Sequence, residues 1–149
     1  MQPSKITIWG WDRLDAIQVD YPTNGGPNGI STTGRMGDTQ RPDGHGGYTG
    51  GSNQPPHGGS WNLNVDHYVS SAVVQSGTIV NAIQLKFSDG TSSNWCGGPG
   101  GTSVVVNYDG HFLSSMKVMG VSKFYGSANC LVIGFKLLPI KNPNLTQIG

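Results

Sequence analysis

A short motif occurs three times in this chain, and that repetition constrains the fold more than any other feature. Asp15-Ala-Ile-Gln-Val-Asp-Tyr21 matches Asn81-Ala-Ile-Gln-Leu-Lys-Phe87, and Asn129-Cys-Leu-Val-Ile-Gly-Phe135 is a more divergent copy. In each copy a short polar residue, Asp or Asn, begins a strand-like run and an aromatic residue closes it. Internal similarity of this kind indicates a fold built from repeated units.

The segment before each copy repeats as well. Each is a strand-like run, so each unit is predicted to be a strand, a tight loop and a second strand. The first strands are expected at residues 5–9, 68–74 and 112–119, and the loops at residues 10–15, 75–81 and 120–129. Two glycine-led segments also correspond to each other, Gly58-Gly59-Ser60 before residues 61–65 and Gly100-Gly101-Thr102 before residues 103–107.

Length and composition favour one all-β domain over residues 1–149. The 24 glycines cluster in loops, no stretch has a helical period, and the chain is long enough to bury a core. Only 11% of residues are charged and the net charge is +1, so nothing favours a nucleic-acid partner. No apolar run is long enough to insert into a membrane. The start lacks the features of a signal peptide, so we expect a cytosolic protein or one whose leader is absent from this sequence.

The repeats predict a triangular arrangement of three four-stranded antiparallel sheets around one core. Each sheet alone would leave an apolar face open, and three faces packed together bury it. Residues 61–65 form a good expected strand, whereas residues 30–36 form a weak one inside the long glycine-rich loop 24–59. A loop of that length is either functional or mobile. Prolines interrupt the tail, residues 138–149.

The two cysteines, Cys96 and Cys130, leave two interpretations open. Two free thiols are favoured, and a bridge between the second and third units is the alternative. His45 and His57 lie in the glycine-rich loop with Asp38 and Asp43, but their loose spacing favours a solvated loop over a metal site. We therefore expect no metal and no cofactor.

The order of these elements resembles the jacalin-related lectins over residues 5–137. The most specific parts are residues 9–21, 58–64, 80–87 and 97–101. The resemblance implies a β-prism of three Greek-key sheets. It also implies a sugar site between a Gly-Gly loop and a Gly-x-x-x-Asp loop of the same sheet, with each unit's tight loop meeting the glycine loop that follows it.

Carried onto this sequence, the resemblance implies carbohydrate-binding residues in all three units. They are Asp12, Arg13, Leu14, Asp15, Gly58 and Gly59 in the first, Gly77, Ile79, Val80, Asn81, Gly100 and Gly101 in the second, and Tyr125 and Asn129 in the third. Only Asp15 keeps the family's carboxylate, and Trp11 stands where its glycine is expected. The first glycine-rich hairpin of the family is missing before Lys5, and the tail is a candidate to replace it.

These residue types suit sugar binding for physical reasons. A carboxylate accepts two adjacent hydroxyls of a hexose through charge-assisted bonds, and an Asn oxygen accepts without charge. Glycine lets a facing backbone approach the ring. Trp11, Tyr48 or Tyr125 could pack on an apolar sugar face. The alternatives are plain: Asp or Asn before a strand is commonly a turn residue, Gly-Gly pairs are commonly turns, and Trp9, Trp61 and Trp95 suit core packing.

Three functions follow from this sequence. The favoured one is a lectin for mannose- or glucose-type glycans or glycoproteins, without catalysis and multivalent through two loops of one chain or a homo-oligomer. The second is a structural or protein-interaction prism that binds no sugar. The third, a glycosidase, needs two facing carboxylates, and no such pair can be chosen from the eight acidic residues.

Overall fold

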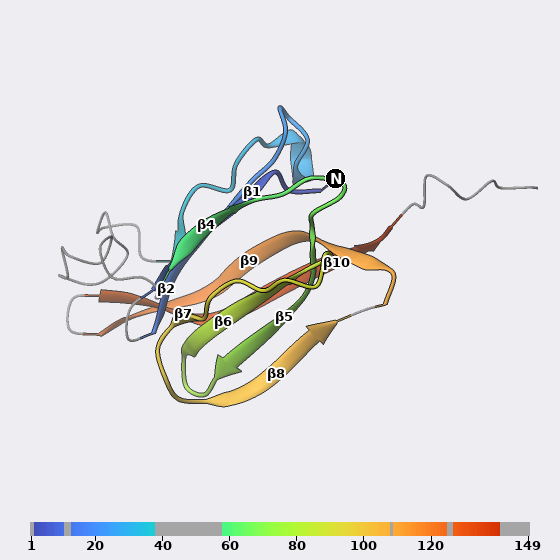
Figure 1. Ribbon diagram of the computed structural model, residues 1–149. Helices are drawn as coiled ribbons and strands as arrows, with labels where there is room; N and C mark the ends of the chain where they lie inside the picture. The colour runs from blue at the N-terminus through green and yellow to red at the C-terminus, as the bar shows by residue number, and fades with distance from the viewer. Residues whose placement is uncertain (1, 11–12, 38–57, 108, 125–126, 141–149) are drawn as a thin grey trace, which may run out of the picture.

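The computed structural model describes residues 2–10, 13–37, 58–107, 109–124 and 127–140. It describes the side chains of these residues, except for those of residues 119–132. Within them the chain is almost entirely β-strand, with a single 3-10 turn at Pro27–Gly29 (Figure 1). No helix in these ranges is long and apolar enough to cross a membrane. The strands are β1 (Lys5–Gly10), β2 (Leu14–Asp20), β3 (Met36–Gly37), β4 (Gly59–Asn62), β5 (Val69–Ser76), β6 (Val80–Phe87), β7 (Cys96–Gly97), β8 (Thr102–Asn107), β9 (His111–Phe124) and β10 (Ser127–Pro139).

The strands form three antiparallel sheets, which confirms the expected all-β architecture. The first sheet has the order β3-β2-β1-β4 and the second the order β7-β6-β5-β8. The third sheet consists of β9 and β10 within the described residues, so it shows two strands rather than the expected four. Whether the tail replaces the family's missing first hairpin concerns residues 141–149, which lie outside the described residues.

One apolar core joins the three sheets. In β1, β5 and β6 buried residues largely alternate with more exposed ones, as the period of a half-buried strand requires. Tyr21 also links two sheets, because its buried hydroxyl donates a 2.8 Å hydrogen bond to the Ser114 carbonyl on β9. Desolvation raises the pKa of this tyrosine. The most deeply buried members of the core include Ile6, Leu14, Ile17, Val19, Val69, Ile83 and Leu85.

The first two sheets repeat each other residue by residue. In both hairpins the register shifts beside the tight loop, because the second strand has one more residue there than the first. Trp9 pairs with Ala16 and Gly10 with Leu14, which leaves Asp15 as the extra residue. Gln75 pairs with Ala82 and Ser76 with Val80, which leaves Asn81. The polar residue that begins each repeat therefore forms a β-bulge, a feature that re-aims a side chain.

A hydroxyl supports the same point of each sheet. The backbone N–H of Val19 donates to Thr33 Oγ1 at 3.0 Å, and the N–H of Leu85 donates to Ser93 Oγ at 2.9 Å. Each hydroxyl in turn donates to the carbonyl of the next residue, Gly34 or Asn94. The segments that lead into β3 and β7 are thus equivalent, so the first part of the long glycine-rich loop belongs to the first sheet.

Several expected boundaries are wrong. The third unit has no tight loop over residues 120–129, because β9 continues to Phe124 and β10 begins at Ser127. Residues 30–36 contain only an isolated bridge and the start of β3. The expected strand 61–65 is β4, which ends at Asn62, and Val65 is 79% exposed.

The two Gly-Gly segments are also not equivalent, contrary to expectation. Gly59 pairs with Ile8, whose counterpart Val74 pairs with Val104, three positions beyond Gly101. The core sets this register, because Trp61 packs against it from β4 as Val106 faces inward from β8. Apolar packing therefore outweighs the glycine pattern that suggested the alignment.

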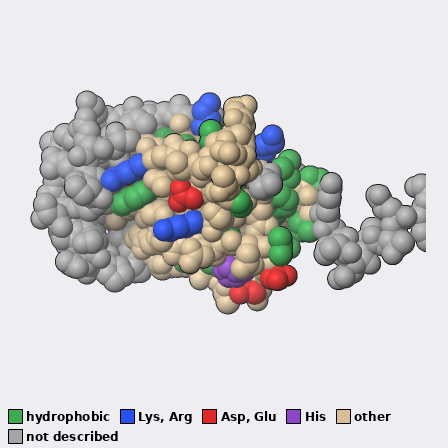
Figure 2. All heavy atoms as spheres, turned by 90° about the horizontal axis from the view of Figure 1, so that it is seen from above, with side chains coloured by type: hydrophobic (Ala, Val, Ile, Leu, Met, Phe, Trp, Pro, Cys, Tyr) green, Lys and Arg blue, Asp and Glu red, His purple; other side chains and the backbone are tan. Residues whose placement is uncertain are grey.

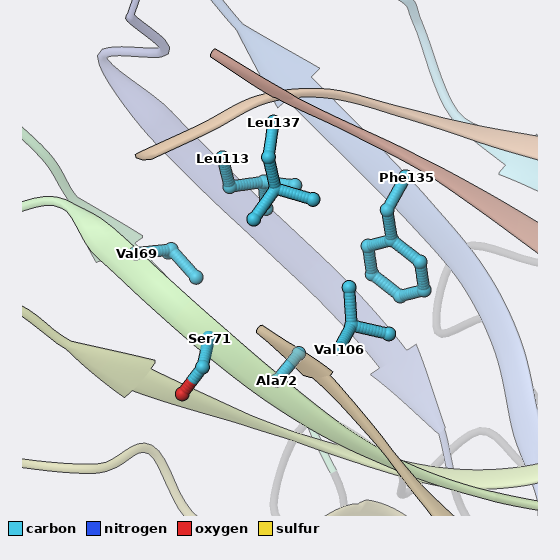
Figure 3. A pocket seen from close by; sticks show the side chains of 7 residues that line it. All are labelled: Val69, Ser71, Ala72, Val106, Leu113, Phe135 and Leu137. Carbon is cyan, nitrogen blue, oxygen red and sulfur yellow. The ribbon is translucent and has the colours of Figure 1, made fainter. Parts of the chain in front are cut away.

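An apolar hollow lies where the second sheet meets the third (Figure 3). Val69 and Ala72 of β5 and Val106 of β8 point into it from one side, and Phe135 and Leu137 of β10 from the other. Ser71 carries its one side-chain hydroxyl. A sugar needs several hydroxyl partners, so this hollow does not suit one.

Candidate functional site

The tight loop of the second sheet is short and held by its own backbone. Residues 77–79 join β5 to β6, and the N–H of Gly77 donates to the Ile79 carbonyl at 2.9 Å. Gly77 and Thr78 are exposed, whereas the Val80 side chain is buried in the core. Of the predicted site residues here, Val80 can contribute only its backbone.

Asn81 faces the glycine loop before β8, as the resemblance implies. Its Nδ2 donates to the Pro99 carbonyl at 3.4 Å, which leaves Oδ1 available as an acceptor. A Cβ at Gly101 would lie 2.8 Å from that Oδ1 and 2.7 Å from the Ser76 nitrogen, and the φ of Gly101 is +82°. A Cβ at Gly100 would lie 3.2 Å from Nδ2. The loop therefore comes this close to Asn81 because both positions lack side chains.

β7 closes the other side of Asn81. Gly98 donates its N–H to the Asn81 carbonyl at 3.0 Å, and a Cβ at Gly97 would lie 2.1 Å from that oxygen. Gly37, at the equivalent place in the first sheet, has nearly the same φ, +111° against +115° for Gly97. The preceding Cys96 is free and fully buried, and desolvation raises its pKa to about 12. A neutral buried thiol is a packing group here, not a reactive one.

The equivalent residue of the first sheet is less accessible to solvent than Asn81. Asp15 occupies the bulge between buried neighbours and is 0% exposed. Arg13 is half-buried and Leu14 fully buried. A Cβ at Gly58 would lie 2.5 Å from the Ile8 carbonyl, so Gly58 and Gly59 run along β1. Gly58 and Gly59 therefore do not stand where Gly100 and Gly101 stand in the second sheet, and the residues before Gly58 lie outside the described part of the chain.

Of the remaining predicted residues, Asn129 is not in such an arrangement and the others lie outside the described residues. Asn129 pairs with Ser122 inside the β9–β10 ladder, and the register there shifts across Leu131 instead. Asp12, Tyr125, Trp11 and Tyr48 lie outside the described residues. So do the histidines and aspartates of the long loop, and the described part of the chain contains no group of three metal-ligating side chains.

Three tryptophans considered in the sequence analysis lie within the described residues. The guanidinium of Arg35 lies 4.5 Å from the centre of the Trp9 ring, a cation–π contact on the first sheet. Trp61 packs against the core, as expected, whereas Trp95 is 37% exposed. Trp9 is therefore covered by Arg35 and is not a free stacking platform.

Sequence reasoning missed the groups that shape this site. Thr33 and Ser93 hold the bulged strands, and Pro99 orients the Asn81 amide. A signal was present in the sequence, since Thr32-Thr33 and Ser92-Ser93 both stand four residues before the Gly that follows Met36 or Cys96. The site can accept one hydroxyl through Oδ1 and offers loop backbone at short range on both sides.

Comparison with known proteins agrees with this geometry at the level of the fold. Neither a protein-family model nor a curated protein sequence matches the chain. Among solved structures, the mannose-binding jacalin-related lectin AcmJRL of Ananas comosus is similar over 94% of this chain and 84% of its own, with a TM-score of 0.65 and 16% identity. This protein has the β-prism fold of the jacalin-related lectins.

Two further β-prism structures show the same relationship. Frutalin from Artocarpus incisa, solved in complex with galactose, has a TM-score of 0.65 at 14% identity and covers 93% of this chain and 92% of its own. The prostate-specific glycoprotein lectin WGA16 has a TM-score of 0.62 at 16% identity, covering 95% and 85%. Identities this low leave the sugar site of this chain to be argued from its own residues.

Proposed function

We propose that this protein binds glycans of the mannose or glucose type, without catalysis, at the tight loops of its first two sheets. The observation that carries the proposal is the close approach of the Gly100 and Gly101 backbone to Asn81, whose Oδ1 remains available as an acceptor. A hexose hydroxyl can donate to Oδ1, and the backbone of residues 77–80 lies within the same loop. Similarity in fold to a mannose-binding lectin supports the sugar class.

Asp15 is the second proposed acceptor and differs from Asn81 in charge and in access. A carboxylate makes a stronger bond to a hydroxyl than an amide oxygen does. Because Asp15 is 0% exposed, a sugar would reach it only after neighbouring groups move. We therefore propose Asn81 as the readily accessible site and Asp15 as the one that requires rearrangement.

The absence of a partner carboxylate argues for binding over hydrolysis. Glycosidases use two facing carboxylates. The segments that form this site, residues 75–81 and 96–101, contain no Asp or Glu. We therefore propose that a glycoside bound there is released without being hydrolysed.

The test is a glycan array followed by calorimetric titration of the best ligand, with free mannose and galactose as competitors. Asn81→Ala is expected to weaken binding about tenfold or more, because the acceptor and its orientation are both lost. Asn62→Ala, at an exposed position on β4, is the matched control and should bind as the parent does. An array with no bound glycan at high loading, or an Asn81→Ala variant that binds as the parent does, would refute the site.

A protein-interaction prism without sugar binding is the second candidate. It is favoured by the exposed valines of β8, Val104 at 54% and Val105 at 64%, since such side chains suit a protein partner. Partners that are captured equally well with and without competing mannose would support this function over the first.

A further inference from the structure

β8 is an edge strand that lacks the usual protection. Within the described residues it pairs only with β5, so the backbone groups of its other side have no strand beside them. Its sequence, Thr102-Ser-Val-Val-Val-Asn107, contains no charge and no proline. Its pairing with β5 runs from Ser71↔Asn107 to Ser76↔Thr102 without a shift. Edge strands normally carry one of these features because they prevent pairing with other chains.

Apolar side chains extend to both faces of this edge. Val105 pairs with Val73 on the outer face of the sheet and is 64% exposed. Val104 pairs with Val74 on the inner face and is 54% exposed. Val106 points into the hollow toward the third sheet (Figure 3). A strand that adds to this edge would cover valines on both of its faces at once.

The equivalent edge of the first sheet has the opposite character. β4 occupies the place of β8, and Ser60 corresponds to Val105, because Ser60 pairs with Thr7 as Val105 pairs with Val73. β4 has four residues, and its exposed side chains are Ser60 and Asn62. Ser60 Oγ also bonds to Thr7 Oγ1 at 2.6 Å. The same backbone position is therefore polar in one sheet and apolar in the other.

We propose that β8 pairs antiparallel with β8 of a second copy of this chain, about a twofold axis that joins two second sheets into one eight-stranded sheet. An antiparallel strand pairs with itself under twofold symmetry, so one strand supplies both halves of the contact. Cross-strand partners share a face, so inner side chains must oppose inner ones.

One register satisfies this rule and pairs all three valines with valines. Val105 opposes Val105 of the second copy on the outer face, and Val104 opposes Val106 on the inner face. Ser103 then opposes Asn107, so no charges meet. Moving the axis to Val104 would leave Val105 and Val106 opposite Ser103 and Thr102, with less apolar surface covered.

This dimer would set the geometry of sugar binding. The Gly101 residues of the two copies lie at opposite ends of the paired strands, eight positions apart, or about 27 Å along the strand direction. Two glycan sites facing opposite ends would cross-link separate glycans. This consequence rests on the function proposed above, whereas the dimer itself does not.

The first experiment measures mass in solution by sedimentation equilibrium for the parent, Val105→Lys and Ser60→Lys. A lysine at position 105 would face its own copy across the axis, so this variant is expected to be monomeric. Ser60→Lys places the same charge on the equivalent strand and should remain dimeric. A parent that stays monomeric at high concentration overturns the proposal, and so does a Val105→Lys variant that stays dimeric. In the first case an extended peptide of another protein would be the occupant of the edge.

The second experiment tests the register with single cysteines under mild oxidation. Directly opposite residues have Cβ atoms about 4.5–5.5 Å apart, within adjustment of a disulfide, whereas diagonal neighbours are about 7–8 Å apart. Val105→Cys should therefore form a covalent dimer and Val104→Cys should not. Efficient cross-linking of Val104→Cys alone would overturn the register. Calorimetry on monomeric Val105→Lys separates the two proposals, because binding per chain should equal that of the parent.

Discussion

The first and second sheets have the same backbone and different surfaces. Asp15 and Asn81 are the extra residues of equivalent bulges, and Thr33 and Ser93 support the strands beside them. On the outer face, the row Ser60, Thr7 and Gln18 of the first sheet corresponds to the row Val105, Val73 and Gln84 of the second. Figure 2, which views the molecule from the side of the first sheet, shows only scattered Lys, Arg, Asp and Glu side chains among the described residues on that face.

This difference shows which positions are the same in both repeats and which are free to differ. Inner positions must fill one core, and bulges must place one residue outside the ladder, so those positions stay alike. Outer positions and the bulge side chain are free to change without loss of the fold. The first sheet therefore combines a buried carboxylate with a polar face, and the second an accessible amide with an apolar one.

The largest expected effect comes from a side chain placed between Asn81 and the glycine loop that packs against it. In Gly101→Ala the new Cβ meets Ser76 and Asn81 Oδ1 below 3.0 Å, at a φ of +82°. We expect sugar affinity to fall tenfold or more, about 1.4 kcal/mol or greater, together with a lower melting temperature. Gly90→Ala is the control, since its φ is +88° but no atom lies within 4 Å of the new Cβ. Equal sugar affinity in both variants would show that the close contact between Gly101 and Asn81 plays no part in binding.

The supporting hydroxyls are the next point of comparison. Ser93→Ala leaves the buried Leu85 N–H without its acceptor, at an expected cost of about 1–3 kcal/mol in the free energy of unfolding. Thr33→Val removes the equivalent acceptor of Val19, where the bond is only partly buried, and should cost less. Urea unfolding of both variants gives the comparison. A larger loss for Thr33→Val would show that the two supports are not equivalent in energy.

Cys96 and Met36 occupy equivalent positions, and only the cysteine can ionise. The pKa of Cys96 is about 12 in the folded protein against a usual value of 9.0. Its contribution to stability is therefore complete below pH 9 and is lost as pH rises from 9 toward 12, by about 1.4 kcal/mol per pH unit. Unfolding in urea at pH 8 and pH 10 should show a smaller alkaline loss in Cys96→Ala than in the parent. Identical losses would contradict the burial of the thiol.

The smallest expected effect is the exchange of the two bulge residues. Asp15→Asn keeps the size and the turn chemistry, so the fold should survive and affinity at the first site should fall several-fold, about 1 kcal/mol. Asn81→Asp places a charged acceptor at the accessible site and should strengthen binding there by a similar amount. Titration of both with the best array sugar, with melting temperature as a control, makes the test. If Asp15→Asn binds as tightly as the parent, the first site plays no part.

Local pattern predicted those parts of the molecule that depend on neighbours in sequence. The strands of the first two hairpins, their tight loops and the polar residue beside each loop follow from alternation and from the repeat. The approach of Asn81 to Gly100 and Gly101 follows from the resemblance to jacalin-related lectins. The pattern of apolar and polar residues also predicted an all-β chain.

Tertiary packing decided the rest. The register of β4 was set by Trp61 against the core, so the two Gly-Gly segments fell at different heights although their sequences match. In the third hairpin, β9 and β10 remain paired through the residues where a loop was expected, because a strand extends as far as it has a partner strand. The burial of Asp15 and the open edge of β8 depend on neighbours distant in sequence. Sequence alone determined which residues could form strands and bulges, and only the packed structure decided which of them solvent or a partner can reach.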